Sequence, residues 1–378
     1  MGRLLRTCPH PASPRCLPVA STSRRLLVPL LVLVLTAACG TTSTSHRPAG
    51  TATPASTATP ATTETPAITT PSPSVDATPT GTPNSLPLAT VDFSCRLPLV
   101  TVVGTTTTAG FISFPSGSFA AYPGGNIKSK ALGLAYDRTY NRWLPVDWRL
   151  VSDDGARYVY ETFSDETWSP TAYSIIHIVD VATGTDRVVS RTGQFILNDY
   201  VGTGVYLSKW VGAHDGPGPE IGAVLDPTSG AVRVLGGGKG YGYWVGSGAG
   251  WRTDYNATDP TVHQGMTGPN RVTRVDLASG AEATWLYQQG ADWVQILGFD
   301  PAGHPIVSAG TGQVVTGWLL IDATHRSQLF SGSAFLGWAT ADTHGIWFSD
   351  GSSTYLHTAS SGLRRVASTG GQIAGGCH

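Results

Sequence analysis

The sequence predicts an all-β protein, a six-bladed β-propeller of four-stranded blades, on three observations. A short turn motif returns at intervals of 46 and 50 residues, as DVATG at Asp180, DPTSG at Asp226 and DLASG at Asp276. A second series of glycine turns alternates with it, and no stretch beyond the first 38 residues has a helical period of apolar residues. Short strands in units of about 40 to 50 residues are typical of a propeller.

The repeated motif has the residue types of a strand–turn–strand unit. In VLDPTSGAVRVL, the Asp226 side chain can cap the turn, Pro227 presets the backbone angle, and Gly230 supplies the positive φ of a bulged hairpin. Matching turns end at Asn141, Gly184, Gly230, Gly280, Arg326 and Gly362, and the alternating turns end at Gly110, Gly155, Gly204, Gly250, Gly303 and Gly345. The two alternating series therefore predict six units of two hairpin turns each.

The second unit, RLVSDDGARYVYETFSDETW followed by IIHIVDVATGTDRVV, resembles the TolB-type propeller repeat. That repeat has an SPDG turn, an apolar strand and then a DVATG turn. Asp153, Asp154 and Gly155 match the first turn, and Asp180 and Gly184 match the second. The resemblance implies a six-bladed propeller, often extracytoplasmic, and it implies no single activity because propellers carry many functions.

The chain begins with features of an export signal. Arg24 and Arg25 precede the apolar run LLVPLLVLVLT, which is too short to span a bilayer, so residues 1–38 are predicted to be a signal peptide. LTAAC resembles the bacterial lipoprotein box, which would make Cys39 the lipidated first residue of an extracytoplasmic, membrane-anchored lipoprotein. A secreted protein is the alternative. SRRLLV is similar to a twin-arginine signal, so the export route stays open.

Residues 39–90 are predicted to be the lipidated cysteine and a disordered linker. Residues 40–90 hold sixteen Thr, nine Pro and no aromatic residue, and such a segment buries too little apolar surface to fold. All eleven Trp lie between Trp143 and Trp347, so residues 91–378 are predicted to form the propeller.

The two ends of the predicted propeller are expected to meet. From Leu97 to Ala367 the sequence divides into whole blades, each made of consecutive strands. The tail TGGQIAGGCH is similar in sequence to TGQFILND, the start of an inner strand. The tail should therefore return to the first blade, beside Cys95. Two cysteines at opposite ends of an exported domain predict a Cys95–Cys377 disulfide.

Charge and motifs limit the possible functions. Without the five Arg of residues 1–38 the chain has 19 basic and 25 acidic residues, whereas nucleic-acid binding requires clustered basic residues. No G-x-S-x-G, H-E-x-x-H, C-x-x-C or phosphate-loop motif is present. We therefore assign no catalytic residue, metal or cofactor, and consider an enzyme the less favoured reading.

Four long loops are predicted between the second and third strands of blades one to four, at residues 115–131, 163–173, 211–219 and 254–270. Long loops on a rigid scaffold commonly carry function. Aromatic side chains beside acids and amides suit sugar stacking or a protein partner, although they could equally seal gaps between blades. The candidate ligand-binding residues on these loops and an interblade loop are Trp168, Tyr173, His214, Asp215, Tyr241, Tyr255 and His263.

The same loops suggest two possible metal sites. Asp254, Asn256 and Asp259 could supply oxygen ligands to Ca²⁺, but their spacing differs from an EF-hand and fits an Asx-rich turn better. His214, Asp215, Asp254 and His263 could form a metal or acid–base cluster only if adjacent blades bring them together.

Three functions remain open from the sequence. The first is a monomeric, membrane-anchored binding module that recognises a protein or glycan on the long-loop face. The second is a structural or assembly factor of the envelope. The third is an enzyme with a dispersed or central-channel site, which acidic residues converging on the channel would favour.

Overall fold

The computed structural model describes residues 83–103, 106–124, 127–130, 133–164, 173–191, 195–202, 204–210, 220–235, 244–246, 248–256, 268–333, 336–337 and 339–378. These residues form 25 strands and two single-turn 3-10 helices, η1 (Pro83–Ser85) and η2 (Trp148–Leu150). Neither of the described helices is long and apolar enough to cross a membrane.

The strands form six antiparallel blades and one extra hairpin. Blade 1 has the strand order β25 (Gln372–Ile373), β1 (Cys95–Val103), β2 (Thr106–Phe114), β3 (Ser118–Ala121); the hairpin is β4 (Ala135–Asp137) and β5 (Arg142–Leu144). Blade 2 has β6 (Arg157–Phe163), β7 (Ser174–Asp180), β8 (Asp186–Arg191), and blade 3 has β9 (Phe195–Val201), β10 (Gly204–Trp210), β11 (Glu220–Leu225), β12 (Val232–Val234). Blade 4 has β13 (Trp244–Gly246), β14 (Ala249–Asp254), β15 (Arg271–Asp276), β16 (Glu282–Tyr287). Blade 5 has β17 (Trp293–Phe299), β18 (Pro305–Thr311), β19 (Val314–Leu320), β20 (Arg326–Gly332), and blade 6 has β21 (Thr340–Asp342), β22 (Gly345–Ser349), β23 (Thr354–Thr358), β24 (Gly362–Ala367).

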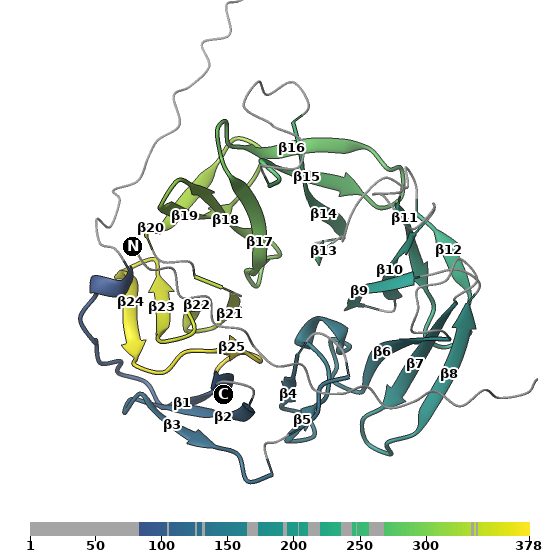
Figure 1. Ribbon diagram of the computed structural model, residues 1–378, viewed down its shortest axis with the longest axis horizontal. Helices are drawn as coiled ribbons and strands as arrows, with labels where there is room; N and C mark the ends of the chain where they lie inside the picture. Colours follow the sequence, from purple (N-terminus) through teal and green to yellow (C-terminus); the bar gives the residue numbers. More distant parts are fainter. Residues whose placement is uncertain are drawn as a thin grey trace, which may run out of the picture. The chain divides into compact units, whose positions relative to one another are not determined.

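The blades stand around a ring, with the first strand of each blade toward the centre and the last strand outside (Figure 1). In blade 2 the inner position is taken by Val151, which forms an antiparallel bridge with Tyr158 of β6. This bridge completes the sixth four-stranded blade. The predicted six-bladed propeller is confirmed.

The repeated turn has the chemistry that the sequence predicts. Gly184, Gly230 and Gly280 have φ of 71°, 74° and 73°. Each donates its backbone N–H over 2.8 Å to the carbonyl of the Asp four residues earlier. That aspartate also accepts hydrogen bonds through its carboxylate, for example from the N–H of Thr183 to Asp180 at 2.8 Å. These three turns join the third and fourth strands of blades 2, 3 and 4, and the motif recurs there because this type of bulged hairpin needs one residue with positive φ.

Blade 1 differs from its prediction. Gly110 does not end a turn but lies within β2, opposite Leu99 and Ala121. A Cβ at this position would lie 2.5 Å from the Phe119 ring, so the glycine provides space for an aromatic side chain on the next strand. The predicted long loop at 115–131 is also wrong in part, because residues 118–121 form the outer strand β3.

Two further boundaries are corrected. Gly250 lies inside β14, and the β13–β14 turn contains Gly248 instead. The expectation that each blade consists of consecutive strands is wrong for blade 1. Strands β4 and β5 do not complete this blade but pair only with each other.

The chain closes by mixing its two ends in one blade. The tail strand β25 occupies the inner position beside β1, with Leu99 opposite Ile373, as the echo of an inner strand predicted. The Cys95–Cys377 disulfide is present, with Cα atoms 5.7 Å apart. Both cysteines are buried among the side chains of blades 1 and 6. The expectation of a closing disulfide is confirmed.

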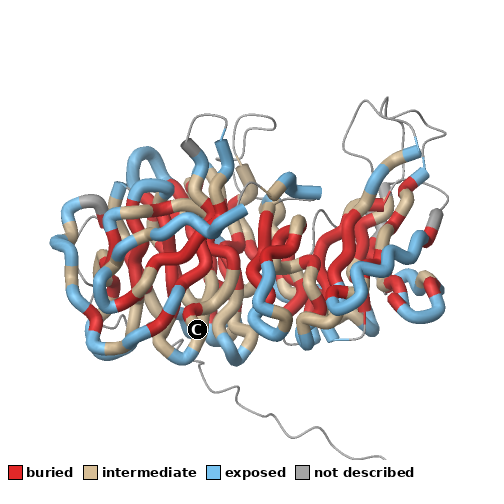
Figure 2. The backbone as a smooth tube through the Cα atoms, turned by 90° about the horizontal axis from the view of Figure 1, so that it is seen from below, coloured by how far each residue is buried: buried red, intermediate tan, exposed pale blue. Residues whose placement is uncertain are grey.

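The core lies mainly between neighbouring blades rather than at the centre of the ring. Apolar clusters join blades 2 and 3, blades 4 and 5, blades 5 and 6, and blades 6 and 1. Trp251 and Trp347 are fully buried in these interfaces. Figure 2 shows the buried residues along the middle of the strands, with exposed residues at the turns and loops at their ends. Trp251 and Trp347 therefore help to seal neighbouring blades together.

The described part of the chain begins before the predicted propeller boundary. Leu88 forms a parallel bridge with Arg365 of β24, and the N–H of Ala89 donates to the Arg365 carbonyl over 2.8 Å. Leu86 packs on the cluster between blades 5 and 6. Residues 83–90 thus contact the propeller.

Candidate ligand-binding site in the central cavity

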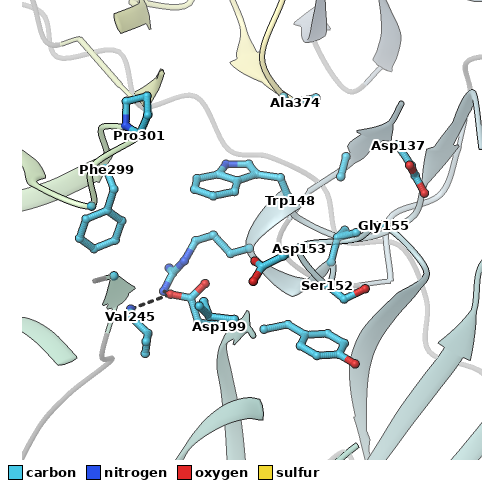
Figure 3. Close-up of a pocket in the computed structure, with 18 of the residues that line it drawn as sticks. Asp137, Trp148, Ser152, Asp153, Gly155, Asp199, Val245, Phe299, Pro301 and Ala374 are labelled. Atoms are coloured by element: carbon cyan, nitrogen blue, oxygen red, sulfur yellow. Dashed lines mark hydrogen bonds and ion pairs between the residues drawn. The ribbon is translucent and has the colours of Figure 1, made fainter. Parts of the chain in front are cut away.

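A cavity of about 990 Å³ lies at the centre of the ring (Figure 3). We call it the central cavity. Its wall comes from the β4–β5 hairpin, η2, the β9 and β13 strands, the β17–β18 turn and the tail after β25. Its charged and aromatic lining residues are Tyr136, Asp137, Arg138, Trp148, Arg149, Asp153, Asp199, Tyr200, Trp244, Phe299 and Asp300.

The cavity lies near the turns between first and second strands. Residues 152–155 and 300–303 are two such turns in its wall. The predicted loops at 163–173, 211–219 and 254–270 join second to third strands, whose ends in an antiparallel blade lie at the other end of the ring. The central cavity and the predicted long-loop site are therefore on opposite faces.

An ion pair supports the inner wall. Arg149, in η2, approaches Asp199 of β9, with its Nη2 3.3 Å from Oδ2. The same oxygen accepts the N–H of Val245, at 2.8 Å, from the inner strand of the next blade. Burial raises the pKa of Asp199 to about 6, and the nearby Arg149 guanidinium opposes that shift. Asp199 thus links blades 3 and 4 and is still mainly ionised at neutral pH.

Arg149 also stacks on an aromatic ring. Its guanidinium carbon lies 3.5 Å from the centroid of the Trp244 ring, a close cation–π contact. Trp148, the preceding residue, is half-buried, and its ring lies across the cavity from Phe299 in Figure 3. The wall therefore combines flat apolar surfaces with charged groups.

The η2 turn is held by Asp147. Its Oδ1 caps the turn by accepting the N–H of Arg149 at 3.0 Å, and its Oδ2 accepts the Gln372 side chain at 2.8 Å. Burial raises the pKa of this carboxyl, and both hydrogen bonds oppose the shift. Because Gln372 belongs to β25, ring closure and the position of Trp148 and Arg149 are coupled.

Asp137 is a buried carboxylate in the wall. Its Oδ1 accepts the N–H of Thr139 at 2.8 Å, whereas no described residue donates a hydrogen bond to Oδ2. The side chain approaches Gly155 closely, since a Cβ there would lie 2.8 Å from Oδ1. A carboxylate oxygen buried without a donor is costly unless a further group satisfies it.

Two more carboxylates are fixed at turns. Asp153 accepts the N–H of Gly202 from the next blade at 2.8 Å. Asp300 accepts the N–H of His304 at 2.7 Å and lies 2.9 Å from its Nδ1. These backbone hydrogen bonds hold the acids in place, so the cavity presents a preformed acidic wall.

A groove of about 1030 Å³ continues from the cavity over the interface of blades 2 and 3. The two spaces share the wall residues Ser152, Asp153, Tyr200, Val201 and Val245. A ligand in the cavity could therefore extend onto this groove.

The structure describes only two of the seven predicted ligand-binding residues. Tyr173 and Tyr255 are exposed, at 42% and 46%, on blades 2 and 4. The other five, Trp168, His214, Asp215, Tyr241 and His263, lie outside the described residues, as does the predicted lipidation site Cys39. The long-loop site thus stays a prediction.

Asp254 belongs to a network of ion pairs rather than to an open metal site. Its carboxylate lies 2.9 Å from Nε of Arg252 and 2.5 Å from Nε of Arg271. Arg252 also pairs with Glu282 at 2.7 Å. Two guanidinium groups make Asp254 a poor cation ligand. Within the described residues no group of three or more His, Cys, Asp or Glu side chains could hold a metal ion.

The residues of the central cavity were not selected from the sequence. Asp199 and Arg149 are 50 positions apart, and Asp199 and Val245 meet only across a blade interface. One signal was available: Asn198 and Asp199 interrupt the otherwise apolar inner strand FILNDYV. Of the two, Asp199 lines the cavity, whereas Asn198 donates to the Ser208 hydroxyl within blade 3 at 2.8 Å.

Comparisons with known proteins give no family for this chain. No family model matches the chain, and no curated protein matches it. Among solved structures, TolB from Acinetobacter baumannii is similar, with 13% identity and a TM-score of 0.41 over 76% of this chain and 67% of that one. An oligogalacturonate lyase from Vibrio parahaemolyticus has 11% identity and a TM-score of 0.42 over 71% of this chain and 85% of that one. A prolyl endopeptidase has 14% identity and a TM-score of 0.39 over 72% of this chain, which spans only 42% of its length.

These similarities concern the propeller fold alone. The strand order of this chain itself establishes its blades.

Proposed function

We propose that the protein is an extracytoplasmic binding module, anchored to the cell membrane through Cys39, and that the central cavity holds its ligand. The cavity carries the proposal: a preformed space of about 990 Å³ lined by aromatic rings and fixed carboxylates. Ligand sites are commonly concave, partly apolar and equipped with a few fixed polar groups. The export signal and the lipoprotein box of the sequence support the location.

The binding test is thermal unfolding of the full-length protein in detergent micelles against glycans, cell-wall fragments and small amines. A ligand present at 100 times its Kd stabilises the folded state by about 2.7 kcal/mol. We expect the shift in Tm to disappear in Trp148→Ala, which removes a cavity wall, and to persist in Tyr173→Ala. Tyr173 is an exposed aromatic residue of the long-loop face and serves as the matched control.

The reverse pattern would move the site to the long-loop face, as the sequence predicted for a protein or glycan partner. Loss of the shift in Tyr173→Ala with retention in Trp148→Ala would contradict the proposed cavity site.

The anchor has its own test. The mass of the mature N-terminus should show Cys39 carrying acyl chains, and Cys39→Ala should release the protein from the membrane fraction. A mature N-terminus without acyl chains would leave the secreted alternative.

An enzyme is the second candidate function, and one observation favours it. Four carboxylates, Asp137, Asp153, Asp199 and Asp300, converge on the cavity. All four accept hydrogen bonds from backbone N–H groups, which fix their positions and suit ligand binding. Turnover of a bound compound that is lost in Asp153→Asn would establish the enzyme instead.

A further inference from the structure

We propose that the ligand of the central cavity is an organic cation, a small compound with an ammonium, quaternary ammonium or guanidinium group. This inference rests on the proposed binding function and specifies its ligand. Three observations support it: the charge of the wall, the stacking of Arg149 on Trp244, and the Asp137 carboxylate oxygen that lacks a hydrogen-bond donor among the described residues.

The wall carries more negative than positive charge. Among its described residues are four carboxylates and two guanidinium groups, those of Arg138 and Arg149. Arg149 pairs with Asp199 inside the wall. Arg138 is exposed at the β4–β5 turn. An anionic ligand would meet an excess of like charge, whereas a cation gains from it.

The cavity wall already accommodates one cationic group of the chain itself, the Arg149 side chain, by aromatic stacking and by pairing with a carboxylate. The Arg149 guanidinium lies 3.5 Å from the Trp244 centroid and 3.3 Å from the Asp199 carboxylate. Trp148 and Phe299 offer two further aromatic rings in the same wall. No described Lys or Arg stacks on either ring. A ligand cation placed there would complete a second pairing of aromatic ring and carboxylate.

Asp137 provides an independent indication of a missing donor. Its side chain lines the cavity at only 6% exposure, and among the described residues Oδ2 has no hydrogen-bond partner. Buried carboxylate oxygens are normally paired. An ammonium or guanidinium N–H is a donor that also neutralises the charge, whereas a quaternary ammonium group supplies the charge without the donor.

The test is calorimetric titration of the full-length protein in detergent micelles with choline, agmatine and spermidine. The neutral control is 3,3-dimethylbutan-1-ol, which has the shape of choline without its charge. We expect saturable binding of at least one of these cations, and 3,3-dimethylbutan-1-ol should bind at least about tenfold more weakly than that cation. Asp137→Asn and Asp153→Asn keep the shape of the wall and should each weaken the cation by about tenfold. Asp92→Asn, at an exposed acid outside the cavity wall, should not.

The outcomes separate this inference from the function on which it rests. Cation binding no tighter than that of the neutral isostere, or unchanged in both Asp137→Asn and Asp153→Asn, would overturn the cationic ligand. If a neutral saccharide then bound and Trp148→Ala abolished its binding, the cavity site would stand with another ligand class. Two acid variants are used so that misfolding of one leaves the other decisive.

Discussion

At the scale of single residues, the blade interfaces hold carboxylates where apolar side chains would suffice. Glu161 of β6 accepts the N–H of Leu197 from the next blade at 3.1 Å. Burial raises its pKa to about 7, which the hydrogen bond only partly opposes. The folded protein therefore binds a proton at Glu161 more tightly than the unfolded chain does.

This raised pKa gives a pH prediction. Between about pH 4.5 and 7 the folded state holds more protons than the unfolded state, so the free energy of unfolding falls as the pH rises through this window. Glu161→Gln keeps an acceptor for Leu197 without the buried charge. It should raise stability at pH 8, by up to about 3 kcal/mol, and have little effect at pH 4.5. Urea unfolding at both pH values measures this; an equal effect at both would show that Glu161 has an ordinary pKa.

The Arg149–Asp199 pair should respond in a different way. Arg149→Met leaves the buried Asp199 carboxylate without its cation, a change that typically costs about 3–5 kcal/mol. Since the Asp199 pKa is already raised to about 6, protonation at low pH should relieve most of that loss. Comparing wild type and Arg149→Met by denaturant unfolding at pH 5 and pH 8 gives the difference. A loss independent of pH would mean that Arg149 acts mainly by packing on Trp244.

At the scale of elements, closure depends on a two-residue strand. β25 pairs with β1 through two residue pairs, Leu99 with Ile373 and Val100 with Gln372, and the disulfide of Cys95 and Cys377 lies beside it. The tail adds further backbone hydrogen bonds, from Ala374 to Pro98 at 3.0 Å and between Arg96 and His378 at 2.7 and 3.1 Å. The disulfide reinforces this closure covalently.

Removal of the disulfide should show how much the bond contributes to the stability of the closed ring. The cysteines are 282 positions apart, and the chain entropy of so long a loop predicts a loss of about 3–5 kcal/mol for Cys95→Ser with Cys377→Ser. Guanidinium unfolding with and without reductant measures it. Reductant should lower the stability of the wild type to that of the double variant and leave the double variant unchanged. An equal stability of all four samples would show that β25 closes the ring without the bond.

Local chemistry explains which elements could be predicted. The Asp–Gly turns are encoded within about five residues, so Gly184, Gly230 and Gly280 were placed correctly from the sequence. Blade 1 was not, because a glycine such as Gly110 has two uses, a turn or the close approach of an aromatic ring. Which use applies depends on the pairing of β2 with β3, a contact that composition does not encode.

At the scale of the whole molecule, the site depends on the ring rather than on any one segment. The central cavity takes wall residues from the hairpin, blades 2 to 5 and the closing tail. Reasoning from loop length favoured the opposite face, where most of the candidate residues lie outside the described parts of the chain. A sequence reveals long loops directly, whereas a cavity between blades exists only once distant segments such as η2 and β9 have been brought together.

The most direct test of the central claim is amide hydrogen exchange of the full-length protein in detergent micelles, with and without a saturating concentration of whichever of choline, agmatine and spermidine binds most tightly. Binding in the central cavity should slow exchange in the turns at 152–155 and 300–303, which form its wall. The segments at 163–164 and 255–256, at the edges of the long loops, should exchange as before. Slower exchange confined to the long-loop segments, or no change anywhere, would contradict the assignment of the ligand to the cavity.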